Sequence, residues 1–215
     1  MQIRIIITAL ILCAAFSAPA SAEGMLGLGV HLGAHHDVGN LSNQERSFLY
    51  DPQNSMLVGF SFKANMNFLF FRTGCDASMM LNRGNGLDNG TPTPPVIEYA
   101  SFSYLAIPGF LGIRYPLKDV GEFYMGAGVA YFIGTGEVKL TLAASAEDVE
   151  AIALGYGFVT GIEFKLLQFL HLYMEWEYFD ARSDPVMKTG STTWKDLHID
   201  FSGHRVLLGV MYYLL

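Results

Sequence analysis

Alternation between apolar residues and polar or small residues is the dominant pattern of this chain. In residues 56–67 the even positions are apolar from Met56 to Met66, whereas the odd positions are mostly polar or small, as at Lys63 and Asn65. Side chains alternate between the two faces of a strand, while a helix would spread such a pattern around its axis. The pattern therefore predicts a β-strand with one apolar face.

The same alternation recurs along the chain and predicts further strands. The predicted strands cover residues 26–35, 56–67, 69–79, 105–115, 123–133, 155–165, 170–179 and 205–214. Each segment is long enough to cross a bilayer at a tilt, which takes about 9–11 residues. An even number of strands suits a single-chain barrel. We therefore predict an all-β fold, a membrane-spanning antiparallel up-and-down β-barrel of eight strands.

Short and long connections alternate between the predicted strands. The short ones are expected at 65–68, 116–121 and 167–168, and the long ones at 38–54, 82–96, 135–153 and 180–196. Barrels of this kind place short turns in the periplasm and long loops outside the cell. The pattern thus predicts four surface-exposed loops, of which the third has room for a short helical turn.

Two places interrupt the alternation. Pro108 lies inside a predicted strand and cannot donate a hydrogen bond to a neighbouring strand, so we expect a bulge there. Before the last strand, apolar residues occupy the odd positions 197–201, but from Val206 onward they occupy the even positions. Either a bulge near 202–203 or emergence of the chain from the membrane would reconcile the two patterns.

Composition also favours a membrane location. The 215 residues are 51% hydrophobic and 15% charged, whereas a soluble domain has about 25% charged residues. Residues 23–215 nevertheless contain no apolar run of about 18 residues, so we expect no transmembrane helix. Arg4, the apolar stretch 5–16 and the small residues 20–22 predict a signal peptide over 1–22, followed by an outer-membrane barrel over 23–215.

Charge and cysteine content restrict the partners. Loss of residues 1–22 would leave 12 Lys plus Arg (13 − 1) against 20 Asp plus Glu, a net charge of −8. Nucleic-acid binding, which needs a basic surface, is therefore not expected. Cys13 is interpreted as part of the signal segment, with lipid acylation as the alternative. Cys75 is then the only cysteine left, so no intramolecular disulfide can form.

A set of charged side chains falls on the predicted inner face. These residues are Lys63, Arg72, Asp76, Arg114, Glu163, Lys165, Glu175, Glu177 and Arg205. Enclosed charges are costly unless they are paired, so we predict a hydrogen-bonded network. The network either fills and polarises the lumen or acts as a gate or selectivity filter. Inward glycines such as Gly157 and Gly161 either leave space or admit bulky neighbours such as Tyr124 and Tyr173.

Three segments carry a family resemblance. Residues 124–131 (YMGAGVAY), 157–164 and 209–215 (GVMYYLL) resemble the small outer-membrane barrels of the OmpA, OmpX and OmpW type. The resemblance covers nearly all of residues 23–215, and it implies contact with outer-membrane lipid and folding by the barrel-assembly machinery. Those families usually end in an aromatic residue, whereas this chain ends in Leu214 and Leu215.

Three functions of different kinds are compatible with these patterns. The first is a non-enzymatic barrel whose loops act in envelope structure or bind an extracellular ligand. The alternative that the OmpW resemblance suggests is a narrow channel or binding barrel for small or hydrophobic solutes, since eight strands are too few for an open porin. An enzyme is the third. His31, His35 and His36 do not make a metal site without further ligands, and Asp76 with Ser78 lacks a hydrolase spacing. We therefore predict no catalytic residue, cofactor or metal.

Overall fold

A computed structural model describes residues 26–36, 48–50, 55–80, 97–118, 120–140, 147–183, 187–188 and 197–214. Its strands are β1 (Leu26–His36), β2 (Phe48–Tyr50), β3 (Ser55–Met66), β4 (Leu69–Met80), β5 (Ile97–Pro116), β6 (Gly121–Leu140), β7 (Glu147–Lys165), β8 (Leu170–Asp180), β9 (Met187–Lys188), β10 (Leu197–Ile199) and β11 (Gly203–Leu214). The predicted signal peptide and Cys13 lie outside the described residues.

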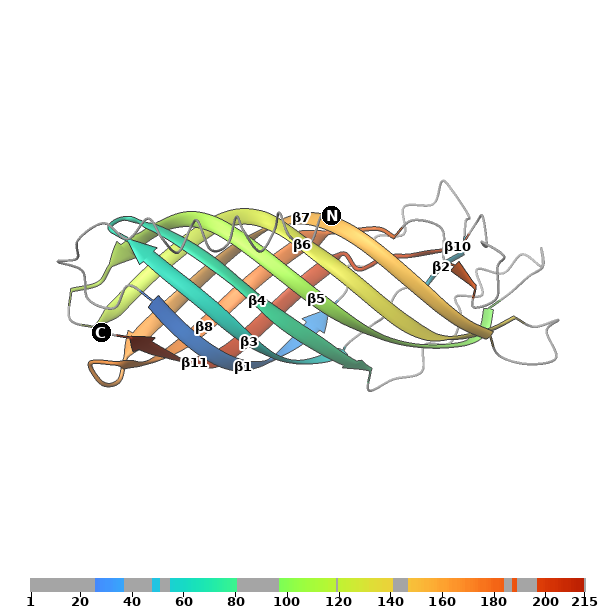
Figure 1. Cartoon of the computed structure of the whole chain (residues 1–215), viewed down its shortest axis with the longest axis horizontal. Coiled ribbons are helices and arrows are strands. Elements are labelled where there is room, and N and C mark those ends of the chain that lie inside the picture. Colours follow the sequence, from blue (N-terminus) through green and yellow to red (C-terminus); the bar gives the residue numbers. More distant parts are fainter. Residues whose placement is uncertain are drawn as a thin grey trace, which may run out of the picture.

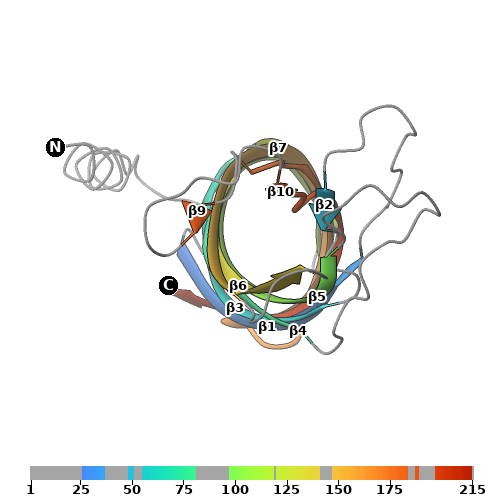
Figure 2. The same cartoon turned by 90° about the vertical axis from the view of Figure 1, so that its right-hand side faces the viewer.

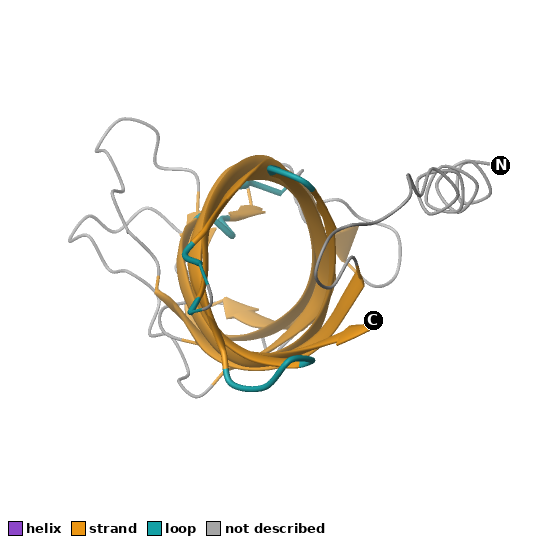
Figure 3. Cartoon of the chain, turned by 90° about the vertical axis from the view of Figure 1, so that its left-hand side faces the viewer, coloured by secondary structure: helices purple, strands orange, loops and turns teal. Residues whose placement is uncertain are grey.

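A closed antiparallel sheet forms the body of the molecule (Figure 1). Its strands follow the order β6-β5-β4-β3-β1-β11-β8-β7, and pairing of β6 with β7 closes the ring. Figures 2 and 3 look along this ring from its two ends. The prediction of an eight-stranded all-β barrel is confirmed.

The barrel carries its apolar residues on the outside, as the alternation predicted. Along β11 every second side chain is buried, including Arg205 and Met211, while Val206, Leu208 and Tyr212 between them are exposed. This distribution is inverted relative to a water-soluble protein and suits a lipid surround. None of the described residues belongs to a helix of the length and apolarity that a membrane crossing requires.

Short turns join the strands at one end, where they were predicted. Asn67 and Phe68 connect β3 to β4, and residues 166–169 connect β7 to β8. Asn67 has a φ of 55°, a left-handed conformation that asparagine tolerates better than most residues. The other end of the barrel carries β2 and β10, which pair in parallel (Figure 1).

Three strands are much longer than predicted. β5, β6 and β7 have 20, 20 and 19 residues, and they continue past the apolar band towards the end of the barrel that carries β2 and β10 (Figure 1). The predicted loop at 135–153, with its helical turn, is therefore wrong over 135–140 and 147–153. Beyond the cross-strand pair Ile133 and Ile152 the outward residues are polar, as in Glu137 opposite Asp148, so the apolar outer face ends while the strands persist.

No bulge occurs at Pro108, contrary to the prediction. Pro108 pairs with Ala130 in a β5–β6 register that is unbroken from Tyr99 to Pro116 and shifts only between Ile97 and Tyr99. On the other side, Thr73 still faces Gly109 and Asp76 still faces Ala106, so the β4–β5 register is the same above and below the proline. Because proline has no N–H, the ladder is interrupted locally without an inserted residue. The Thr73 hydroxyl donates to the Pro108 carbonyl over 2.8 Å and links the two strands there.

The segment before β11 keeps its inward side without a bulge. Ile199 and Phe201 are buried, as are Arg205 and Leu207 after them. The odd positions from Ile199 to Leu207 therefore face the interior, and the bulge near 202–203, one of the two alternatives, is absent. The sequence pattern changes because the interior itself changes from polar to apolar along the barrel axis.

Candidate functional site: the barrel lumen

A first ionic layer fills the lumen near the short turns. Lys63 of β3 places its ammonium 2.5 Å from Glu122 of β6 and 2.8 Å from Glu163 of β7. Arg114 of β5 lies 2.6 Å from the second oxygen of Glu122, and His171 Nδ1 lies 2.6 Å from Glu163. Each carboxylate therefore has two nitrogen-bearing partners, which offsets the cost of enclosing the charges.

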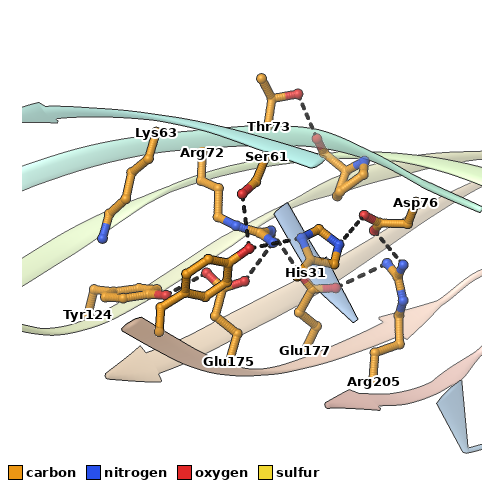
Figure 4. A network of polar contacts seen from close by, with 12 residues as sticks. His31, Ser61, Lys63, Arg72, Thr73, Asp76, Tyr124, Glu175, Glu177 and Arg205 are labelled. Carbon is orange, nitrogen blue, oxygen red and sulfur yellow. Dashed lines mark hydrogen bonds and ion pairs between the residues drawn. The ribbon is translucent and has the colours of Figure 1, made fainter. Parts of the chain in front are cut away.

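A second ionic layer lies deeper in the barrel (Figure 4). The Arg72 guanidinium spans Glu175 at 2.6 Å and Glu177 at 2.7 Å. Glu177 also accepts from Arg205 over 3.0 Å, and Arg205 pairs in turn with Asp76. Strands β4, β8 and β11 thus contribute a continuous chain of alternating charges, in which the planar guanidinium groups bridge carboxylates with separate nitrogens.

A chain of hydrogen bonds through His31, Tyr173 and Ser61 extends this second layer (Figure 4). His31 Nε2 lies 2.8 Å from Asp76, and His31 Nδ1 lies 2.8 Å from the Tyr173 hydroxyl. The Tyr173 oxygen is 3.1 Å from Ser61 Oγ. The combination of Asp, His and hydroxyl groups resembles a hydrolase relay in composition, but His31 and Asp76 have no exposed side-chain surface. A substrate has no access to these groups in this structure.

An aromatic layer fills the lumen near the long loops. Phe132 stacks on Phe201 with ring centroids 5.2 Å apart, and its edge meets Phe179 at 5.7 Å. Tyr104 packs against Phe132 at 5.8 Å and Phe201 at 5.5 Å. Phe110 completes the group beside Phe179 at 5.4 Å. We call these five residues the aromatic layer.

The second ionic layer contacts the aromatic layer. The Arg72 guanidinium lies 5.9 Å from the Phe110 ring centroid, and Arg205 lies 5.5 Å from that of Phe179. Phe132, Phe179 and Arg72 are all 0% exposed. A water-filled passage would expose the side chains beside it, so the barrel is sealed at both the ionic and the aromatic level.

Inward glycines make room for large side chains, which decides between the two interpretations of them. A Cβ built on Gly161 would lie 2.5 Å from Tyr124, and one built on Gly209 would lie 2.6 Å from Tyr173. The Tyr124 ring in turn covers the Lys63 ammonium at 3.8 Å, and its hydroxyl donates to Glu175 over 2.6 Å. Gly161 and Gly209 therefore admit aromatic neighbours rather than leave the lumen open.

The structure brings most of the predicted lumen charges into ion pairs. The ion pairs described above join Lys63, Arg72, Asp76, Arg114, Glu163, Glu175, Glu177 and Arg205. Lys165 lies half-buried at the end of β7. Sequence reasoning missed Glu122, because the predicted strand began one residue later, although its parity with Tyr124 places it inside.

The histidines considered as metal ligands diverge. His35 pairs with the Tyr104 hydroxyl at 2.6 Å inside the barrel, whereas His36 is exposed on the outer side. Within the described residues no cluster of His, Cys, Asp and Glu side chains is arranged to hold a metal ion.

Comparison with solved structures finds other small barrels. The outer membrane protein OprG from Pseudomonas aeruginosa superposes with a TM-score of 0.59 at 13% identity, covering 89% of this chain and 96% of that chain. Neisserial surface protein A gives 0.49 at 14% identity, covering 88% and 96%. Ail of Yersinia pestis gives 0.46 at 10% identity, covering 90% and 100%. At these identities the OprG likeness supports the fold alone.

Comparison with protein families is more specific. No curated protein matches the chain significantly. The family model described as an outer membrane protein beta-barrel domain matches residues 7–213, which include the whole closed ring except Leu214, the last residue of β11. The chain therefore belongs to the outer membrane protein β-barrel domain family, and its place is the outer membrane.

Proposed function

We propose that this protein is a non-conducting, non-enzymatic barrel that anchors an extracellular interaction surface in the outer membrane. The observation that carries the proposal is the sealed lumen. Two ionic layers and one aromatic layer succeed one another along the axis, and Lys63, Arg72 and Phe132, one from each, are 0% exposed. A conduit for solutes would require all three layers to rearrange.

The extended strands supply the surface. β5–β7 continue beyond the apolar band as a three-stranded sheet, with Glu137, Asp148 and Glu150 exposed on its outer side. Short β9 adds to this sheet by pairing with Val149 and Glu150 of β7. Hydrogen-bonded strands hold such a surface more rigidly than loops do, which suits recognition of an extracellular ligand.

An enzymatic role is disfavoured because a substrate cannot reach the candidate catalytic groups. The groups closest to a catalytic constellation are Asp76, His31 and the hydroxyls of Tyr173 and Ser61, and all of them are buried in mid-barrel. General base catalysis needs the base within hydrogen-bonding reach of a substrate. These residues are better explained as part of the lumen packing.

Conductance in planar bilayers tests the sealed lumen. We expect the folded protein to give no reproducible current steps, and the same result for Leu208→Ala, a control whose side chain faces lipid. Reproducible steps in the unaltered protein, changed in size by Glu175→Gln, would contradict the proposal and favour the narrow-channel alternative. Turnover in a phospholipid hydrolysis assay would contradict the non-enzymatic part.

Cysteine labelling tests the surface. In a Cys75→Ala background, Glu137→Cys lies on the extension and Lys118→Cys lies in the short turn between β5 and β6. A membrane-impermeant maleimide added to intact cells should label the first variant and not the second. Permeabilising the outer membrane should then expose the second variant. The opposite order would show that the extension faces the periplasm.

A further inference from the structure

A hollow interrupts the outer wall of the barrel. It has a volume of about 540 Å³ and lies over β5, β6, β7 and β8. Its rim is formed by Ile113, Met125, Phe158 and Trp176, and Thr160 lies between them. Gly112 and Gly126, a cross-strand pair, contribute bare backbone to its floor. We call this hollow the outer groove.

The register explains why a groove forms there. Ile113 pairs with Met125, Met125 with Thr160, and Thr160 with Trp176, so the outward side chains lie in one row across four strands. Within that row Thr160 is small and its neighbours are large. Phe158 raises one wall further, because its ring packs against Trp176 with centroids 5.1 Å apart.

The lining is apolar and its one hydroxyl is already used. Thr160 Oγ1 donates to the Tyr124 carbonyl over 3.3 Å, so it offers no free donor to an occupant. None of the lining residues is charged. The groove therefore suits a flexible apolar chain and gives no hydrogen-bonding group by which to recognise a polar solute.

Its position in the membrane identifies the occupant. Ile113 and Met125 are 54% and 46% exposed and belong to the outward apolar band of β5 and β6. The groove is thus continuous with the lipid-facing surface. We propose that it seats one acyl chain of an outer-membrane lipid against Trp176 and Phe158, and holds that lipid longer than the lipids around the rest of the barrel.

Lipid retention tests the groove directly. The protein is folded into phosphatidylethanolamine vesicles, extracted in mild detergent and weighed intact by native mass spectrometry. We expect one phospholipid to remain bound to the unaltered protein. Thr160→Phe, which fills the groove, should lose most of this adduct, whereas the matched control Ala34→Phe, which adds the same ring to the outward face of β1, should retain it.

Fluorescence gives a second readout at the groove itself. In a Trp194→Phe background Trp176 is the only tryptophan, and vesicles containing phosphatidylcholine with brominated acyl chains quench a ring that a chain touches. Quenching should be weaker in Thr160→Phe than in Ala34→Phe, with folding of both checked by the heat-dependent shift in gel mobility.

Three outcomes would overturn the proposal. One is the absence of any retained lipid on the unaltered protein, and another is equal retention by Thr160→Phe and Ala34→Phe. The third is protection of Trp176 from quenching that grows with protein concentration, which would assign the groove to contact with a second copy of the chain.

Discussion

The lumen near the short turns and the lumen near the long loops fill one cylinder with different chemistry. On the turn side, the side chains that meet are charged, such as Lys63 with Glu163 and Arg72 with Glu175. On the loop side they are rings, such as Phe132 on Phe201. Both parts exclude water. The stability of the ionic part depends on how many partners each charge has, whereas that of the aromatic part depends on how completely the rings fill the volume.

This difference bears on how each part specifies its structure. A buried ion pair contributes little net stability, because desolvation opposes the attraction, yet removal of one partner leaves a buried unpaired charge. An aromatic cluster has no such partner rule and responds to the size of the cavity that a substitution leaves. The ionic layers should therefore be sensitive to charge at constant volume, and the aromatic layer to volume at constant charge.

The largest effect is expected for Arg72→Met. The substitution keeps much of the side-chain volume but removes the charge that Glu175 and Glu177 share. Loss of one partner from a buried pair costs about 3–5 kcal/mol of unfolding free energy. Denaturant unfolding of the protein in vesicles, followed by gel mobility, measures the loss.

A double variant separates the cost of the lost charge from the cost of the lost side-chain packing. Arg72→Met combined with Glu175→Gln removes one of the uncompensated carboxylates and should regain part of the lost stability. If the double variant is no more stable than Arg72→Met, the cost comes from packing of the guanidinium and the contrast between the two parts of the lumen fails.

A smaller loss is expected for Phe132→Ala in the aromatic layer. Phe132 touches Phe179, Phe201 and Tyr104, so its removal leaves a cavity that costs about 3 kcal/mol, the lower end of measured values for such changes. Phe132→Leu keeps most of the volume and should lose clearly less in the same assay. Equal losses for the two variants would show that the ring geometry, and not volume, holds this layer together.

Much of this arrangement could be predicted from the alternation alone. Parity assigns each residue of a strand to one face, and this rule is sufficient to place Arg72, Asp76, Glu175 and Glu177 inside the barrel. Their pairing was not predictable. The residues Arg72 and Glu177 are 105 positions apart, and the registers of several strand pairs, which local sequence does not encode, decide that they meet.

The errors have a common physical origin. The extensions of β6 and β7 were predicted as a loop because the expected contrast of apolar and polar faces holds only where one face meets lipid. The aromatic layer was predicted only in part, since parity places Phe132 inside the barrel, but Phe201, on which it stacks, lies before the predicted last strand. Pro108 was overinterpreted because a single missing N–H can be tolerated without a change of register.

Arg205→Lys should cause an intermediate loss that sharpens the view of the ionic part. Arg205 uses one nitrogen for Glu177 and another for Asp76. A lysine has a single ammonium nitrogen in place of the planar guanidinium, so it does not reproduce this two-pronged contact. Loss of one charge-assisted hydrogen bond costs about 1.5–3 kcal/mol. The same unfolding assay applies, and unchanged stability would show that total charge alone decides.

Arg114→Met, at the edge of the ionic part, should have the smallest effect. The Arg114 side chain is 15% exposed, and its partner Glu122 is also held by Lys63, so water and a second cation both compensate for its removal. We expect a loss below about 1 kcal/mol, as for ion pairs that water reaches. Lys63→Met is the matched variant, because Lys63 is fully buried and serves both Glu122 and Glu163. If Arg114→Met and Lys63→Met lose the same unfolding free energy in denaturant, the burial of a cation does not determine what it contributes. The stability of the ionic layer would then depend only on the number of its charges.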